Sequence, residues 1–162
     1  MADSFHFNIS MISRGKRKSA VASAAYISCE KLTNEWDGVT HDYHNKKGNF
    51  IHTYAGIELR LKMYEIMKKQ GHEEETGKAK ITSGYNLPAK YILHTVGPII
   101  QWEVTGKEEE LLASCYRECL KLAADTGAES VAFCCLSTGV FRFPQQRAAE
   151  IATETVKNYI NA

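Results

Sequence analysis

The residues of this 162-residue chain best suited to chemistry are small and polar and lie between a strand and a helix. Ser137, Thr138 and Gly139 follow a strand-like apolar run at residues 131–136, and Pro144 can open the helix that comes next. Free backbone N–H groups and the helix dipole at such a junction favour a phosphate group. The pattern therefore indicates a diphosphate site, although an ordinary strand-to-helix turn looks similar.

The segments that must position this turn alternate between strand-like and helix-like patterns. Some apolar residues alternate with polar ones, whereas longer segments repeat apolar residues every three or four positions. Strands alternating with helices predict an α/β fold with helices packed on a sheet. Strands are expected at residues 5–12, 78–83, 90–96 and 131–136, and helices at 19–32, 56–70, 107–124 and 144–160, with a polar loop at 33–48.

Two of the expected helices carry an apolar face. The helix at 56–70 places four apolar residues at helical spacing, and the helix at 107–124 does the same. The two faces consist of Ile57, Leu61, Tyr64 and Met67, and of Leu112, Cys115, Cys119 and Leu122.

Two longer segments carry a more specific pattern. They read TGKAKITSGYNLPAKYILHTVGP at residues 76–98 and CCLSTGVFRFP at 134–144. Together they resemble the macro domain, an ADP-ribose-binding fold with a mixed sheet, and specifically its zinc-dependent branch, over residues 51–160. The resemblance implies that backbone N–H groups of the STGVF loop wrap the diphosphate and that its aromatic ring lies against the distal ribose. The implied ADP-ribose-binding residues are Ser137, Thr138, Gly139, Val140 and Phe141.

The upstream part of that family pattern is missing. The family has an aspartate that reads adenine, an Asn-containing strand, a glycine-rich catalytic loop and, in this branch, a Cys/His zinc cluster; none of these precedes residue 51 here, and the closing strand is missing after residue 160. The resemblance therefore implies a truncated macro domain at residues 51–162. We expect weak binding of ADP-ribose or ADP-ribosylated protein, no hydrolysis and no cofactor, although the intact related family uses zinc.

The cysteines indicate whether the chain binds zinc and in which cellular compartment it lies. Cys115 and Cys119 share a helix face, and Cys134 and Cys135 lie in a strand-like run that looks buried. Zinc needs three or four ligands brought together, so we expect these residues to act as small buried hydrophobes rather than as ligands. Five cysteines without disulfide-framework spacing favour a reducing cytoplasm.

The first fifty residues carry a different pattern. SRGKRKSAVASAAY at residues 13–26, with HDY at 41–43, resembles the N-terminus of MobA/MobL plasmid mobilisation proteins, DNA relaxases that nick with a tyrosine. The resemblance assigns residues 1–50 to a relaxase-like fragment and makes Tyr26 the candidate nucleophile. Such a tyrosine needs a metal, which that family holds with a His-x-His pair. No two of the six histidines here have that spacing, so a structural tyrosine is the preferred alternative.

Charge and hydropathy indicate whether DNA or a membrane could be a partner of this chain. A basic cluster could contact DNA phosphates without sequence specificity, although such a cluster is usually a solvated loop. The net charge of +1 shows no basic bias, and no apolar run approaches the roughly twenty residues of a membrane span. The start has no signal-peptide pattern, and from the cysteine content we expect a cytoplasmic protein. The cluster consists of Arg14, Lys16, Arg17 and Lys18.

The missing Asn-containing strand leaves a gap between the strands expected at 90–96 and 131–136. Each buried backbone group left unpaired there would cost about 1–3 kcal/mol. Residues 5–12 are the expected occupant of this slot, with 19–32 as the helix that follows. Three hypotheses result: a macro-type ADP-ribose-binding module or hydrolase, which we favour; a relaxase fragment; or a non-functional chimera produced by gene fusion or by an assembly artefact.

Overall fold

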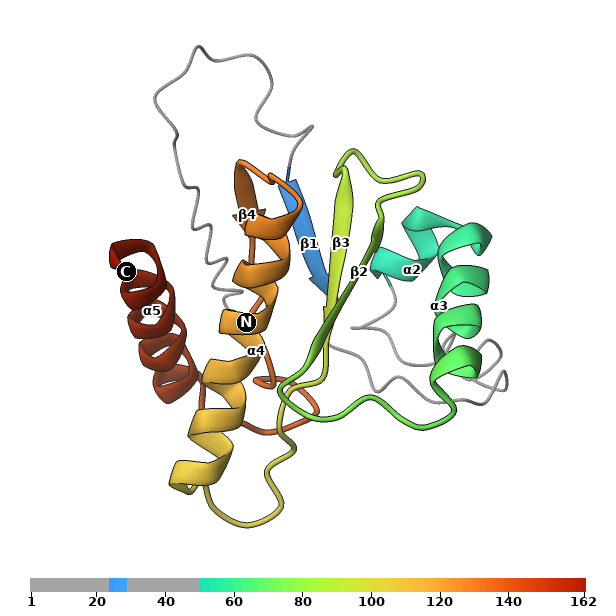
Figure 1. The fold of residues 1–162 in the computed structure, drawn as a ribbon. Coiled ribbons are helices and arrows are strands. Elements are labelled where there is room, and N and C mark those ends of the chain that lie inside the picture. The colour runs from blue at the N-terminus through green and yellow to red at the C-terminus, as the bar shows by residue number, and fades with distance from the viewer. Residues whose placement is uncertain (1–23, 29–49) are drawn as a thin grey trace, which may run out of the picture.

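The computed structural model describes residues 24–28 and 50–162 (Figure 1). None of the helices in these two ranges is long and apolar enough to cross a membrane. Along the chain the described elements are β1 (Ala24–Ser28), α2 (Phe50–Ala55), α3 (Ile57–Gln70), β2 (Ala79–Ser83), β3 (Tyr91–Thr95), α4 (Gly106–Asp125), β4 (Ser130–Ala132) and α5 (Gln145–Asn161).

The described strands form one mixed sheet in the order β2-β3-β1-β4. β1 runs parallel to both of its neighbours, whereas β2 and β3 are antiparallel. Tyr26 at the middle of β1 pairs with Ile92 of β3 on one side and with Ala132 of β4 on the other. The expected α/β fold with a mixed sheet is therefore confirmed.

The slot between β3 and β4 is filled, but not by the predicted segment. β1 lies there, whereas residues 5–12 lie outside the described residues. The helix predicted at 19–32 is wrong for the five of its residues that the structure describes, because Ala24–Ser28 is a strand. Alanine has the highest helix propensity, but such propensities are small, and pairing with strands on both sides outweighs them here.

Helices cover both faces of the sheet. In Figure 1, α2 and α3 lie on one side and α4 and α5 on the other. Neighbouring residues of β3 point to opposite faces, as in any strand. Ile92 joins the smaller core with α2 and α3, while Leu93 joins the larger core with α4, α5 and β4. The result is a three-layer arrangement with the sheet in the middle.

The helices differ in how well the sequence predicted their faces. In α4, Leu112, Cys115 and Cys119 are fully buried, as expected. In α3 the buried side chains are Leu59, Met63 and Met67. The predicted apolar face shares only Met67 with this buried face; its other members, Ile57, Leu61 and Tyr64, are exposed.

Candidate functional site

The loop that follows β4 lies at one edge of the sheet. β1, β3 and β4 are parallel, so their carboxyl ends meet at the same edge, where open α/β sheets bind ligands. In Figure 1 the loops after β3 and β4 lie together at the lower edge, and the second of them leads into α5. The predicted diphosphate loop, residues 137–141, belongs to this second loop.

The loop is closed by its own carbonyl groups. The carbonyl oxygen of Ser137 accepts a hydrogen bond from Phe143 N–H at 2.9 Å, and that of Gly139 accepts one from Arg142 N–H at 3.1 Å. Ser137 and Arg142 adopt left-handed φ values of 60° and 61°, which side chains other than glycine rarely take. The N–H groups of residues 139–141 make no hydrogen bond within the described part of the chain. The loop therefore offers donors to a ligand.

Ser137 adds a side-chain group of the same kind. Its side chain is 5% exposed, yet its hydroxyl has no hydrogen-bond partner among the described residues. A buried polar group without a partner costs about 1–3 kcal/mol, so buried groups are nearly always paired with protein, water or ligand. The Ser137 hydroxyl is therefore a further group that a bound anion could satisfy.

Gly139 leaves open space where a side chain would stand. A Cβ atom at Gly139 would meet no atom within 4 Å, and the residue does not have a positive φ. Neither crowding by the protein nor backbone conformation therefore requires glycine here. Glycine also allows close approach of a ligand to the backbone, and this explanation fits the open space.

The loop after β3 supports residues 137–141 from the side. Ile100 N–H donates a hydrogen bond to the carbonyl oxygen of Phe141 at 2.9 Å. Ile100 is buried in the larger core, while its neighbours Ile99 and Trp102 are exposed. Nothing in the sequence of the two loops marks them as partners, so this contact could not be predicted.

A buried polar cluster, also missed from the sequence, lies on β2, β3 and α2. His94 is 1% exposed, and its Nε2 lies 2.9 Å from the hydroxyl of Thr82. The Thr82 hydroxyl donates to the Ser83 carbonyl, so it accepts its bond from Nε2–H. The rings of His94 and His52 are 6.0 Å apart. Burial, followed by the charge of His52, lowers the pKa of His94 to about 3, so its ring stays neutral near pH 7.

The other predicted residues do not belong to residues 137–141. Tyr26 is in the middle of β1, and the basic cluster at 14–18 lies outside the described residues. Cys134 and Cys135 are exposed, which corrects the expectation that they are buried: β4 pairs with β1 only as far as Ala132, so both cysteines fall in the following loop. No group of three or more His, Cys, Asp or Glu residues within 24–28 and 50–162 could hold a metal ion.

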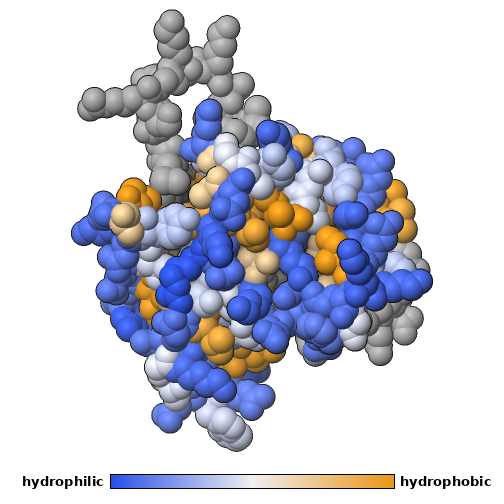
Figure 2. Space-filling view, viewed as in Figure 1, coloured by the Kyte–Doolittle hydropathy of each residue, from blue (hydrophilic) through white to orange (hydrophobic). Residues whose placement is uncertain are grey.

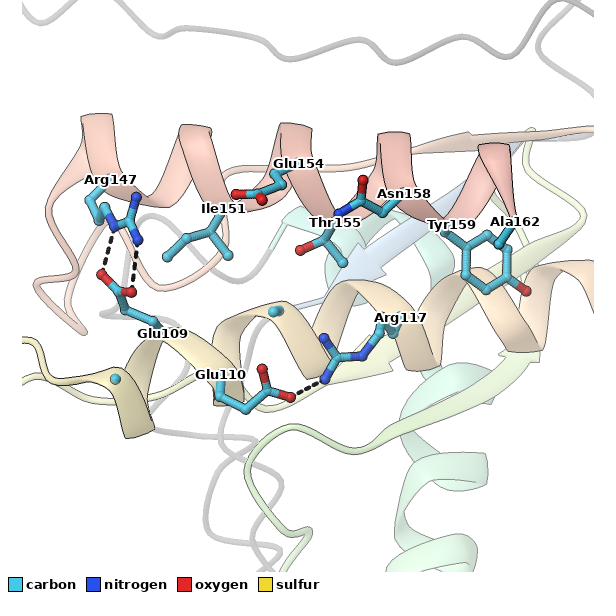
Figure 3. A pocket seen from close by; sticks show the side chains of 12 residues that line it. Glu109, Glu110, Arg117, Arg147, Ile151, Glu154, Thr155, Asn158, Tyr159 and Ala162 are labelled. Atoms are coloured by element: carbon cyan, nitrogen blue, oxygen red, sulfur yellow. Dashed lines mark hydrogen bonds and ion pairs between the residues drawn. The ribbon is translucent and has the colours of Figure 1, made fainter.

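A groove of about 600 Å³ runs between α4 and α5. Figure 3 shows Arg147 directed at Glu109 across the groove and Arg117 paired with Glu110 along α4. The Arg147–Glu109 pair is two-pronged, with N to O distances of 2.6 and 2.8 Å. The hydrogen bonds of this pair lower the pKa of Glu109 and raise the pKa of Arg147. A further hydrogen bond with Glu150 also raises the pKa of Arg147. Because the charges within each pair satisfy one another, they do not mark a ligand site, and the Arg147–Glu109 pair joins α4 to α5.

Two family models match the chain. The Macro domain model matches residues 41–152, and the MobA/MobL family model matches residues 18–55. The two matches overlap at residues 41–55.

Known proteins are similar to about 70% of the chain. A Treponema medium protein described as a protein-ADP-ribose hydrolase is 60% identical over 111 residues, which are 68% of this chain and 42% of that protein. One from Staphylococcus aureus (strain MSSA476) with the same description is 57% identical over 118 residues, 72% of this chain and 44% of that protein. The chain thus spans less than half the length of these relatives.

A solved structure extends the similarity to the fold. The Oceanobacillus iheyensis macrodomain with ADP is 36% identical and superposes with a TM-score of 0.67. The match covers 84% of this chain and 68% of that protein.

Proposed function

Because the chain belongs to the Macro domain family, we propose that the loop at residues 137–141 binds the diphosphate of ADP-ribose. The similar structure from Oceanobacillus iheyensis holds ADP, and the similar curated proteins are described as protein-ADP-ribose hydrolases. The substrate class is therefore ADP-ribose, free or attached to protein.

One observation carries the proposal: the N–H groups of residues 139–141 are unused within the described residues and stand beside open space at Gly139. α5 begins just beyond, at Gln145, without a side-chain cap at Pro144, so the N-terminal end of its dipole also favours an anion. The buried Ser137 hydroxyl adds a donor. All of these groups suit phosphate oxygens.

The resemblance to the macro domain supports the roles that we propose within the loop. Ser137, Thr138, Gly139 and Val140 wrap the diphosphate, mainly with the main chain, and the Phe141 ring lies against the distal ribose. Gly139 is the point of closest approach, because any side chain there would project into the open space that the ligand needs.

Affinity is expected to be low and hydrolysis absent. The sequence has no counterpart of the aspartate that reads adenine or of the catalytic loop. Each lost hydrogen bond to a charged or buried partner costs about 1.5–3 kcal/mol, and about 1.4 kcal/mol corresponds to a factor of ten. Two or three losses change a micromolar dissociation constant to roughly millimolar. His94 and His52 are buried and do not supply a base to this loop.

The test is a titration with ADP-ribose, followed by NMR or calorimetry, on the parent protein and two matched variants. Gly139→Glu places a carboxylate where the diphosphate must approach and should abolish binding. Gly106→Glu is the control, because Gly106 also has open space at its Cβ position and no positive φ, but lies at the start of α4. Equal binding by parent and Gly139→Glu would show that the loop is not the site.

DNA contact is a second candidate, favoured only by the MobA/MobL match to residues 18–55. It would be non-specific and salt-sensitive, through Arg14, Lys16, Arg17 and Lys18. We do not propose nicking by Tyr26, because Tyr26 lies in β1, an inner strand of the described sheet. A cytoplasmic location is proposed on the cysteine content alone.

A further inference from the structure

Large apolar side chains project into solvent on the diphosphate loop and on the loop bonded to it. Trp102 is 94% exposed, Val140 is 72% exposed and Ile99 is 53% exposed. Single exposed apolar residues are ordinary, but a cluster next to a ligand loop is typical of an interaction site. These residues, Ile99, Trp102 and Val140, are referred to below as the Trp102 patch.

The patch is fixed to the diphosphate loop by the main chain. Ile100 N–H donates to the Phe141 carbonyl oxygen at 2.9 Å, and the buried Ile100 side chain anchors this loop in the larger core. Ile99 and Val140 are chain neighbours of the two bonded residues, and Trp102 follows two positions after Ile100. Figure 2 shows hydrophobic residues on the lower part of the face, where Figure 1 has the loops after β3 and β4.

The distal ribose is the end of the ligand that lies next to the Trp102 patch, and this position indicates what the patch binds. The proposed function places Phe141 against the distal ribose, and the polypeptide of an ADP-ribosylated protein is attached to that ribose. The polypeptide therefore emerges beside Phe141 and the loop bonded to it. We infer that the Trp102 patch docks the polypeptide segment flanking the ADP-ribosylated residue, an inference that rests on the proposed function.

The size and surroundings of the patch favour a short peptide segment over a second copy of this chain. A tryptophan side chain buries about 150–250 Å², and Ile99 and Val140 are smaller and already partly covered. The three side chains together therefore offer less than the roughly 800 Å² per partner of a stable interface. Gln101, Glu103 and Arg142, all exposed, lie next to Trp102 and Phe141 in the chain. A small apolar centre with a polar rim suits one apolar side chain of the substrate together with its backbone.

The experiment compares ADP-ribose with two synthetic ADP-ribosylated peptides. One peptide carries leucine next to the modified residue, and the other carries glycine in its place. In the parent protein the leucine peptide should bind at least about tenfold more tightly than the glycine peptide. Trp102→Ala should remove that difference and leave the affinity for ADP-ribose within about twofold.

A fluorescence measurement reports on the contact itself. The chain has two tryptophans, so Trp36→Phe leaves Trp102 as the only one. Its emission should shift to shorter wavelength with the leucine peptide and stay unchanged with ADP-ribose alone. Ile99→Ala should weaken binding of the leucine peptide, whereas the control Ile57→Ala on α3 should not, although Ile57 is exposed to a similar extent, 57% against 53%.

Each outcome separates this inference from the proposed function. An unchanged affinity of Trp102→Ala for the leucine peptide, with ADP-ribose binding intact, overturns the inference alone. Absence of ADP-ribose binding by the parent overturns the proposed function and the inference with it. A dimer in sedimentation that Trp102→Ala converts to a monomer makes a second copy the occupant and also overturns the inference.

Discussion

Acid should weaken the fold through His94. The ring is 1% exposed, its Nε2 bonds to Thr82, and its Nδ1 has no partner among the described residues. Burial and the charge of His52 lower its pKa from 6.5 to about 3. The ring therefore stays neutral in the folded protein at pH values where the unfolded chain has already bound a proton.

The size of the effect follows from linkage. The unfolded state takes up a proton below about pH 6.5 and folded His94 only below about pH 3, so stability is fully present above about pH 6.5 and is lost as the pH falls through that window. The loss approaches about 1.4 kcal/mol per pH unit. Between pH 7 and pH 5 this amounts to about 2 kcal/mol, a large part of the 5–15 kcal/mol typical of a domain.

The assay is urea unfolding followed by circular dichroism at pH 7 and pH 5. His94→Gln keeps an N–H donor for Thr82 and removes the titrating ring. Between pH 7 and pH 5 the free energy of unfolding of this variant should therefore fall by about 2 kcal/mol less than that of the parent. His72→Gln is the control, because His72 is exposed, and it should behave like the parent. If the parent and His94→Gln lose the same stability between the two pH values, the assignment to His94 is refuted.

Three further predictions concern DNA, zinc and a helix cap. Tyr26→Phe should leave plasmid nicking unchanged, because nicking should already be absent in the parent; metal-dependent nicking that this variant abolishes would contradict it. Elemental analysis of protein purified without a metal-binding tag should find substoichiometric zinc, and one zinc per chain lost in Cys134→Ser or Cys135→Ser would show a site. Thr105→Ala removes the capping box that Thr105 forms with Glu108 at the start of α4 and should cost about 1 kcal/mol in urea unfolding.

The sequence predicted elements whose signals are local. β3 begins one residue after its predicted start, and α5 begins one residue after Pro144, because an apolar run and a proline each mark a boundary by themselves. The buried face of α3 was missed because two apolar stripes share this helix, Leu59 with Met63 and Ile57 with Leu61. Only packing against the sheet decides which stripe is buried.

The candidate site was predictable in part for the same reason. The STGVF motif is contiguous, so the residues of the loop could be named from the sequence. The burial of the Ser137 hydroxyl and the bond from Ile100 to Phe141 depend on how separate segments meet. The pairing of His94 with Thr82, twelve positions apart, depends on the register of β2 against β3. No local pattern carries any of these contacts.

β1 fills the slot between β3 and β4 and so completes the sheet edge at which the candidate site lies. β1 lies within the segment that the MobA/MobL family model matches, yet it pairs with β3 and β4, which lie within the Macro domain match. The hydrogen bonds between strands are made by the main chain. Any segment that can adopt an extended conformation and pack between two strands can therefore fill the slot, whatever its sequence motif. Parallel pairing brings three carboxyl ends to one edge, and the diphosphate loop follows the last of them. Because that loop offers main-chain donors, its proposed function depends on the position of this edge and not on which family β1 resembles.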